Sequence, residues 1–294
     1  MRTVVVLGTA TPGGGFPVYG QALAGTVNEF EPGLEITPQN TKGSTENIPL
    51  LEAGKIDLGL VQGEAALEAL NGLGRPPADL RIIAAMYASP GMFVVRADAP
   101  YRAIGDLAGK RIAFGAKGSG LVILARYVLD GLGLDRDKDF DAVFLERAGD
   151  GPQMVMSGEA AALWGAGVGW PGFQAVTDGP AGGRFVVPDA SEIARIQGKH
   201  PLLKTLTVPA GTYSRQAVPI VSVGSWSFVL ARHDLSEDTA YKIARALHVG
   251  EAAIAARLEQ ARETTAANTA SAAPQQELIH PGVRRYLQEI GLVK

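Results

Sequence analysis

The sequence predicts an α/β protein made of two lobes, and three observations support this fold class. Apolar runs of about five residues alternate with amphipathic stretches of about ten or more, which is typical of strands and helices in α/β proteins. A chain of 294 residues is long enough for about two domains. With 46% hydrophobic and 19% charged residues, the chain can bury a sizeable core and is not expected to be disordered.

The expected strands and helices follow one another along most of the chain. The strand-like runs are Val4–Gly8, Leu34–Gln39, Asp57–Val61, Arg81–Tyr87, Met92–Arg96, Arg111–Gly115, Ala142–Glu146, Ala160–Trp164, Arg184–Pro188 and Ile220–Ala231. The helical patterns between them are Val18–Phe30, Thr45–Ala53, Glu64–Leu70, Leu121–Leu132 and Pro171–Asp178. The alternation ends with the long apolar run that begins at Ile220.

The last third of the chain is predicted to be mainly helical. Ser236 precedes two acidic residues and is expected to cap an Ala-rich helix that extends to about Leu258. The polar segment Glu263–Gln276 is expected to form a loop or a weak helix, and Gly282–Ile290 a short final helix.

The two lobes are expected to be interleaved in the sequence. The strand pair within Arg81–Arg96 and the run Ile220–Ala231 are long enough to pass from one lobe to the other. A chain that leaves the first lobe near residue 96 and returns near residue 220 builds the second lobe from its middle. We therefore predict lobe I from residues 1–96 and 220–294, and lobe II from residues 97–219. The sequence shows no internal repeat.

Charge and cysteine content argue against several classes of function. There are 27 Lys and Arg against 30 Asp and Glu, so the net charge of -3 gives no basic imbalance that would favour nucleic acid or an anionic membrane. Cysteine is absent, which removes thiol nucleophiles, zinc thiolates and disulfides. This fits an oxidising compartment, although many cytosolic proteins also lack cysteine. No apolar run reaches the roughly 18 residues of a membrane span.

Three loops share one order of elements, a strand followed by a glycine-rich turn and a helix. They cover residues 7–15, 41–45 and 115–120. Glycine lets the backbone approach a ligand closely, and the N–H groups and dipole of the following helix favour a carboxylate or phosphate. In open α/β sheets ligands lie at the carboxyl ends of strands, where all three loops are expected. Any one loop is explained as well by an ordinary cap, Ser44 or Ser119, but the three together favour a binding site.

Motifs of known enzymes are absent from the sequence. No loop has the G-x-G-x-x-G or G-x-S-x-G pattern, and residues 105–110 fall one residue short of a phosphate-loop spacing. The four histidines are scattered and form no metal-binding motif, and His280 is expected to cap or pack rather than to catalyse. We therefore predict no catalytic residue, no metal and no cofactor.

The three tryptophans divide into two groups. Trp164 and Trp226 are expected in the core. Trp170 lies in a turn flanked by glycines, so a wall of the ligand pocket is as good an interpretation as core packing.

Several segments together resemble the TAXI-type solute-binding proteins of tripartite ATP-independent periplasmic (TRAP) transporters. The segments that carry the resemblance are Gly8-Thr9 through Gly13-Gly14-Gly15 to Tyr19-Gly20, Thr41–Asn47, Leu51–Gln62, Asp106–Arg111, Gly115–Gly120, Pro209–Tyr213 and His280–Gly282. Each segment alone is weak, because similar patterns occur across type II binding proteins. Their order and spacing, over nearly the whole chain, are specific.

The resemblance implies a type II periplasmic-binding fold, in which two α/β lobes joined by hinge strands close on a solute. It implies a monomer that works with a TRAP-type membrane permease and binds glutamate, glutamine or another small carboxylate. It also implies a periplasmic location, so that this chain would be a mature form to which Met1 was added for expression. Without the resemblance, the strand near the N-terminus and the missing export signal would fit a cytosolic protein equally well.

The residues implied in ligand binding lie mainly in the three loops. Backbone N–H groups at Ser44, Thr45, Ser119 and Gly120 would hold the carboxylate, while Tyr19 and Gln62 would give direction. With Trp170 added from its turn, the candidate set is Thr9, Gly14, Gly15, Tyr19, Gly43, Ser44, Thr45, Asn47, Gln62, Ser119, Gly120 and Trp170.

Some residues depart from the family pattern. Glu64 keeps the acid that the family has soon after the Val-Gln pair, but with a longer side chain, and Lys117 lies where a neutral residue is expected. Trp164 and Trp170 add bulk to the middle lobe, and Trp226 lies between two serines in the crossing strand. Lys117 and the extra indoles favour a larger or aromatic carboxylate, unless Lys117 points to solvent, as lysines more often do. Three alternatives stay open: an enzyme on the same fold, a sensor that signals to a membrane partner, and an ABC-type permease as the partner.

Overall fold

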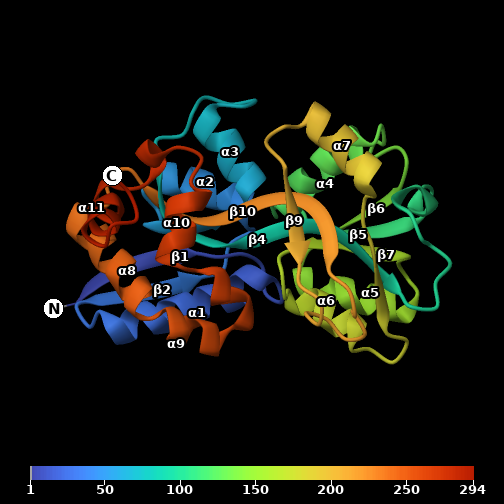
Figure 1. Ribbon diagram of the computed structural model, residues 1–294, viewed down its shortest axis with the longest axis horizontal. Coiled ribbons are helices and arrows are strands. Elements are labelled where there is room, and N and C mark those ends of the chain that lie inside the picture. The colour runs from blue at the N-terminus through green and yellow to red at the C-terminus, as the bar shows by residue number, and fades with distance from the viewer. Residues whose placement is uncertain (1) are drawn as a thin grey trace. The chain divides into compact units, whose positions relative to one another are not determined.

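The computed structural model describes residues 2–294, so Met1 and the question of its origin lie outside the described residues. The chain is mixed α/β, as predicted, and its contacts divide it into two compact units (Figure 1). Unit 1 contains the chain up to Ala10, Phe16–Tyr87 and Trp226–Lys294, and unit 2 contains Thr11–Gly15 and Ala88–Ser225. The divisions at residues 87/88 and 225/226 fall inside two long strands, β4 and β10, which therefore belong to both units.

Unit 1 is built on parallel strands with helices on both faces. Its strands are β1 (Thr3–Gly8), β2 (Leu34–Gln39), β3 (Leu58–Val61) and parts of β4 (Leu80–Arg96) and β10 (Ile220–Arg232). They lie in the order β2-β1-β3-β10, with β1 parallel to both of its neighbours and β10 antiparallel to β3. The helices that follow these strands are α1 (Gly15–Phe30), α2 (Ser44–Glu52) and α3 (Gly63–Asn71). Figure 1 shows α1 on one face of the sheet, and α2 and α3 on the other.

The core of unit 1 follows from the apolar spacing of these elements. Val5 and Leu7 alternate along β1 and are buried on one face of the sheet. Tyr19, Leu23 and Val27 recur every four residues along α1 and bury the side of this helix that packs on them. These contacts fix α1 against β1 and so place the loop between them at the carboxyl end of the strand.

The C-terminal helices complete unit 1. They are α8 (Glu237–Val249), α9 (Glu251–Arg257), α10 (Ala266–Ala272) and α11 (Pro281–Glu289), with short 3₁₀ turns at Glu259–Glu263 and Gln276–Leu278. The predicted cap is confirmed, because Ser236 Oγ accepts a hydrogen bond from Thr239 N. The predicted single helix to Leu258 is wrong, since it is broken at Gly250. A Cβ at Gly250 would lie 2.5 Å from Thr26 Cγ2 and 2.8 Å from Ala246 O, so this close approach requires glycine.

Unit 2 repeats the strand order of unit 1. Its own strands are β5 (Arg111–Ala116), β6 (Asp141–Leu145), β7 (Ala162–Ala166), β8 (Gly183–Val186) and β9 (Lys204–Val208). The order β6-β5-β7-β4 matches the order β2-β1-β3-β10 of unit 1. β5, like β1, is parallel to both of its neighbours, and β4, like β10, is antiparallel to the strand beside it. β8 pairs with β4, and β9 pairs with β10. The repeat is one of topology, in a chain whose sequence shows none.

The helices of unit 2 cover both faces of its sheet. They are α4 (Leu121–Gly131), α5 (Gly151–Ser157), α6 (Pro171–Thr177) and α7 (Ala190–Lys199), with 3₁₀ turns at Ile104–Leu107 and Ala148–Asp150. Two buried clusters alternate along the strands, since Phe93, Phe114 and Trp164 belong to one cluster while their neighbours Val94 and Leu163 belong to the other. Trp164 is therefore in the core, as predicted, and Trp226 is half-buried.

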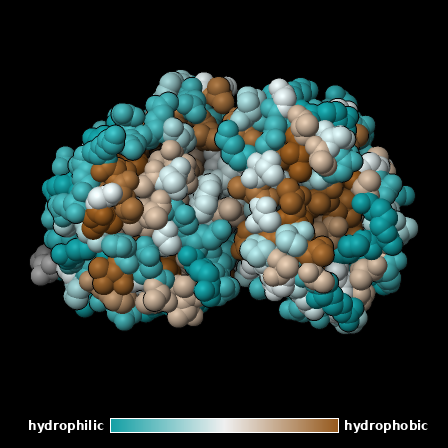
Figure 2. Space-filling view, in the orientation of Figure 1, coloured by the Kyte–Doolittle hydropathy of each residue, from teal (hydrophilic) through white to brown (hydrophobic). Residues whose placement is uncertain are grey.

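Several predicted elements of this region need correction. Residues 81–96 form one continuous strand, β4, and not a pair. β9, α5 and α7 were not predicted. Only Ile196 of α7 is buried and most of β9 is exposed, so neither has a strong apolar pattern to detect. Figure 2, in the orientation of Figure 1, shows brown, apolar side chains on unit 2 in the region where Figure 1 draws β9 and β10.

His280 caps α11, as predicted, and this position makes stability depend on pH. Gly282 N donates to His280 Nδ1 at 3.2 Å and His280 Nε2 donates to Leu235 O at 3.0 Å, so the buried ring is neutral. Burial lowers the pKa of His280, with a smaller opposing effect from the Leu235 carbonyl and Glu237 and a further lowering by Arg81. The stabilisation is therefore complete above the unfolded-state pKa of about 6.5 and is lost as pH falls through the lower folded-state pKa.

We expect His280→Asn to reduce this acid sensitivity, because asparagine also caps helices but does not titrate. Urea unfolding of both proteins at pH 7.5 and pH 5 measures the effect. The other histidines contribute equally to the pH dependence of both proteins, so their contribution drops out of the difference between them. The wild type should lose more unfolding free energy than the variant on acidification. Equal losses would show that His280 does not contribute.

No helix among residues 2–294 is both long enough and apolar enough to span a bilayer.

Candidate functional site

The candidate loops lie at the carboxyl ends of parallel strands. In unit 1 the chain runs from β1 through α1 to β2, and then through α2 back past β1 to β3. The point between β1 and β3 is therefore a topological switch point, where open α/β sheets form their binding sites. The loops after β1, β2 and β3 all end there. Unit 2 has the same arrangement after β5, β6 and β7.

The loops after β1 and β2 are tied together by Thr9. Its backbone N and its Oγ1 both donate to Gln39 O, at 3.0 and 2.9 Å. Thr41 N donates to Ala10 O at 3.4 Å. Thr9 is buried, so its hydroxyl joins the two strand ends and is used within the protein.

The N-terminus of α2 depends on a glycine. Gly43 has a φ of 111°, in the left-handed region that other residues rarely adopt, and its N–H donates to Thr41 Oγ1 at 3.1 Å. Glu46 Oε2 accepts from Lys42 N at 2.6 Å and so places a carboxylate at the positive end of the helix. This turn sets the direction in which the first N–H groups of α2 point.

Ser44 and Gln62 join the starts of α2 and α3. Gln62 N donates to Ser44 Oγ at 3.1 Å, and Gln62 is the residue that precedes α3. Both side chains are buried. Two helix N-termini, 18 residues apart in sequence, are therefore held together at the ends of neighbouring strands, where their dipoles favour a negatively charged group. Thr45, the next candidate, is exposed beside them.

Asn47 has a structural role in the same place. Its Nδ2 lies 2.8 Å from Thr9 O, 2.8 Å from Leu60 O and 3.3 Å from Gly8 O, so one amide bridges α2, β1 and β3. Its Oδ1 makes no hydrogen bond and lies where a Cβ on Gly8 would be 2.7 Å away. The side chain is fully buried and fixes the geometry of the loops from below.

Tyr19 does not reach these loops. Thr264 Oγ1 donates to Met86 O at 2.8 Å, so the Tyr19 hydroxyl donates its proton to Thr264 Oγ1 at 2.9 Å. The ring packs edge-on against Tyr87, with 5.6 Å between ring centroids. Burial raises the pKa of Tyr19 above its ordinary value. Its side chain belongs to the core of unit 1.

The loop after β5 ends with Ser119 and Gly120, directly before α4. Ser119 Oγ accepts from Leu121 N at 3.2 Å, and Gly120 precedes the first residue of α4. Lys117 in the same loop is exposed, and its N–H donates to Leu145 O at 3.3 Å. This loop therefore presents a helix N-terminus of unit 2 with a lysine at its edge.

Gly14 and Gly15 lie in the short segment Thr11–Gly15, which belongs to unit 2. Gly14 N donates to Thr11 O at 3.2 Å, and Thr11 Oγ1 accepts from Ala148 N at 3.3 Å. Gly13 has a φ of 81°, and a Cβ there would lie 2.6 Å from Gly149 Cα. Thr11 was not among the predicted residues. The only feature of the sequence that could have indicated Thr11 is its position inside the first glycine loop.

Trp170 is buried in unit 2. Its ring packs edge-on against Phe173, with 4.9 Å between centroids. A Cβ on Gly165 or Gly172 would lie within 2.5 Å of the indole, so both glycines make room for it. Of the two interpretations from sequence, the structure shows core packing. Glu64, which the sequence pattern marked as a departure, is buried in the first turn of α3, next to Gln62.

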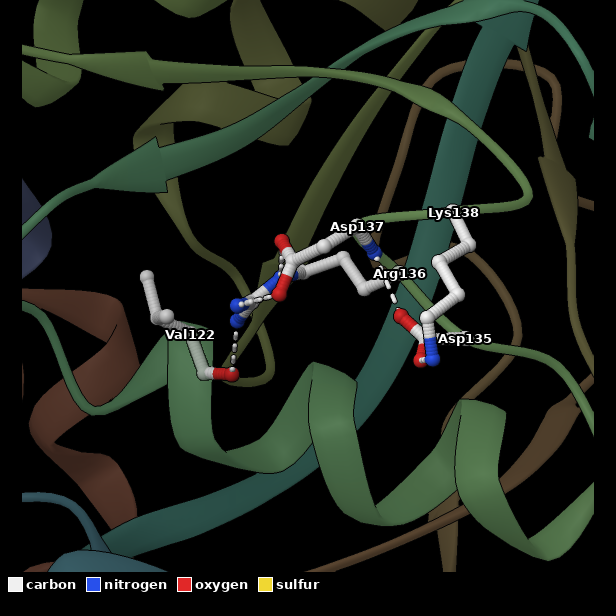
Figure 3. Close-up of polar contacts among 5 residues, drawn as sticks. All are labelled: Val122, Asp135, Arg136, Asp137 and Lys138. Atoms are coloured by element: carbon white, nitrogen blue, oxygen red, sulfur yellow. Dashed lines mark hydrogen bonds and ion pairs between the residues drawn. The ribbon is translucent and has the colours of Figure 1, made fainter.

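One cluster of charged residues outside the loops is paired internally. Arg136 donates through Nε and Nη2 to Asp137 and through Nη1 to Val122 O, while Asp135 accepts from Lys138 Nζ and from Asp137 N (Figure 3). This cluster borders a hollow of about 310 Å³ near His200. Because its charges are paired internally, the cluster does not require a ligand. Among residues 2–294, no group of three or more His, Asp or Glu side chains could hold a metal ion.

Comparison with known proteins agrees with this architecture. The chain belongs to the NMT1-like family, which it matches over residues 7–291. The TAXI-type resemblance is narrower than this match and stays a prediction.

Solved structures similar to this chain include three that bear on the fold. The periplasmic aliphatic sulphonate binding protein SsuA from Escherichia coli shares 20% identity and a TM-score of 0.55, covering 98% of this chain and 84% of that one. A putative L-cystine ABC transporter from Listeria monocytogenes shares 16% and 0.55, covering 88% and 95%. A TctC solute binding protein from Polaromonas shares 17% and 0.53, covering 90% and 89%. At these identities the likeness establishes the fold, which is the predicted type II periplasmic-binding fold.

Proposed function

We propose that this protein is a periplasmic solute-binding protein that captures a small organic carboxylate and delivers it to a membrane permease of the TRAP type. The observation that carries the proposal is the pair of helix N-termini, α2 and α3, joined by Ser44 and Gln62 at a topological switch point. Such a site offers oriented N–H groups and helix dipoles to an oxyanion. It requires no catalytic residue.

Each unit has its own proposed binding groups. In unit 1 they are the N–H groups of Ser44 and Thr45 and the side chain of Gln62, and in unit 2 the N–H groups of Ser119 and Gly120. Gly14, Gly15 and Gly43 let the backbone approach, while Thr9 and Asn47 fix the loops. Hydrogen bonds to a charged group contribute about 1.5–3 kcal/mol each, so a few of them give useful affinity.

The names of the similar structures widen the set of ligands worth testing. They include binding proteins for sulphonates and a cystine transporter. A helix N-terminus binds a sulphonate for the same physical reason as a carboxylate. The TRAP-type partner and the preference for a carboxylate rest on the segments that resemble TAXI-type proteins.

Thermal unfolding with and without ligand tests the proposal. The panel contains glutamate, glutamine, 2-oxoglutarate, succinate, an aromatic carboxylate and an alkanesulphonate. A ligand at 100 times its Kd adds about 2.7 kcal/mol to the unfolding free energy, which raises Tm by several degrees. We expect a shift with one class of carboxylate and recovery of that compound unchanged. A shift with the sulphonate alone, or turnover of the ligand, would contradict the proposal.

A further inference from the structure

We infer that the side-chain amide of Gln62 is the specificity-determining hydrogen-bond donor of the unit 1 loops, and that Ser44 is the residue that positions it. The inference rests on the proposed function, because it takes the solute to carry an acceptor oxygen. It assigns different roles to the two residues that join α2 and α3.

The side-chain amide of Gln62 has a buried donor without a partner. Gln62 is only 4% exposed, and its Nε2 makes no hydrogen bond to any described residue and is shielded from water. An unpaired buried donor is costly, and most buried polar groups have a partner. Asn47, close by, differs in which atom is unpaired, since its Nδ2 donor lies within hydrogen-bond distance of three carbonyl oxygens and its Oδ1 acceptor has no partner. The unpaired Gln62 donor is explained if its partner is an oxygen of the solute.

The Ser44 hydroxyl fixes where this amide lies. Ser44 Oγ accepts from Gln62 N at 3.1 Å, so the bond holds the backbone of Gln62 at the start of α2. Both helices are 9 residues long, and their first turns lie on either side of this bond. The backbone of Gln62 therefore belongs to the same junction as the two helix N-termini. Ser44 acts through Gln62, and Gln62 acts on the solute.

The chemistry of this junction defines the group that it accepts. Among the unit 1 loop residues 9–10, 41–47 and 62–64, the one basic side chain is Lys42, which is exposed. The acceptor oxygen is therefore held by uncharged donors and helix N-termini and not by a buried cation. Affinity contributed here should depend weakly on ionic strength. We expect the ratio of the Kd of Gln62→Leu to the Kd of the wild type to change by less than about threefold between 20 and 500 mM NaCl.

Two variants separate a ligand donor from a structural residue. Gln62→Leu removes the unpaired donor, so the ligand-free Tm should stay the same or rise, while Kd for the carboxylate that stabilises the wild type should increase tenfold or more. The control is Gln197→Leu in α7, because Gln197 Nε2 is bonded to Leu203 O and Thr205 Oγ1. That variant should lower Tm and leave Kd unchanged. A lower Tm for Gln62→Leu would overturn the inference, whether or not a ligand is known.

A double-mutant cycle tests the role of Ser44 by isothermal titration calorimetry. Ser44→Ala should weaken binding in the wild type and have no further effect in Gln62→Leu. Equal losses in both backgrounds would show that Ser44 acts independently of Gln62. If no acid in the panel binds the wild type, the proposed function fails and the inference that rests on it fails with it. If the wild type binds and Gln62→Leu binds equally well, the inference alone fails.

Discussion

Gly224→Ala is expected to destabilise the protein by about 3–5 kcal/mol, or to prevent it from accumulating in soluble form. A Cβ at residue 224 of β10 would lie 2.0 Å from Ser89 O and 2.8 Å from Ser89 C of β4. The obstacle is backbone, so no rotation of a side chain relieves it. Ser222 Oγ also donates to Gly91 O at 2.6 Å, which holds the two strands together beside the glycine. Urea unfolding monitored by tryptophan fluorescence measures the loss.

Gly198→Ala is the matched control for this substitution. Gly198 lies in α7, with no atom within 4 Å of its added Cβ and an ordinary helical backbone. Because alanine favours helices more than glycine does, this variant should be unchanged or up to about 1 kcal/mol more stable. A loss of less than about 1 kcal/mol for Gly224→Ala would contradict the close approach of β4 and β10.

Asn47→Ala is expected to cost about 2–4 kcal/mol of unfolding free energy. The substitution removes the amide that bridges Gly8 O, Thr9 O and Leu60 O, and leaves these carbonyls with fewer partners in a buried place. Because the amide fixes the loops of the candidate site, ligand-induced stabilisation should fall as well. Thermal and urea unfolding, with and without ligand, measure both effects.

Asn71→Ala provides the comparison for this prediction. Asn71 is exposed at the end of α3, and its Nδ2 donates to a single carbonyl, Leu67 O, at 3.0 Å. Its replacement should change stability by less than about 0.5 kcal/mol, as at most surface positions. Similar small losses for both variants would show that the Asn47 bridge does not stabilise the loops.

The elements of the fold that the sequence predicts well are those with strong local patterns. β2 has the predicted bounds, and β1, α2 and α4 begin and end within a residue or so of theirs. α7 and β9 were missed because α7 buries one residue and β9 is mainly polar. The requirement for glycine at residue 250 depends on Thr26, more than 200 residues away, and no local pattern contains this contact.

The candidate site shows the same division between local and long-range information. The glycine loops, and the helices that follow them, are local features that sequence patterns indicate. The bond from Gln62 N to Ser44 Oγ joins residues 18 apart in the sequence. The Tyr19 hydroxyl donates to Thr264 Oγ1, 245 residues away. These partners arise from packing. They assign positioning roles to Ser44 and Asn47 and a core role to Tyr19 that residue types alone do not distinguish.

Hydrogen–deuterium exchange of the wild type, with and without the acid that gives the largest thermal shift, tests the central claim most directly. The account predicts slower exchange on ligand binding in peptides that cover residues 41–47, 62–66 and 117–122, because their helix N-terminal N–H groups would be bonded to the ligand. Protection confined to other parts of unit 2 would contradict it. Those parts are the hollow near His200 and the hollow of about 540 Å³ lined by residues that include Arg96, Met156 and Gly182.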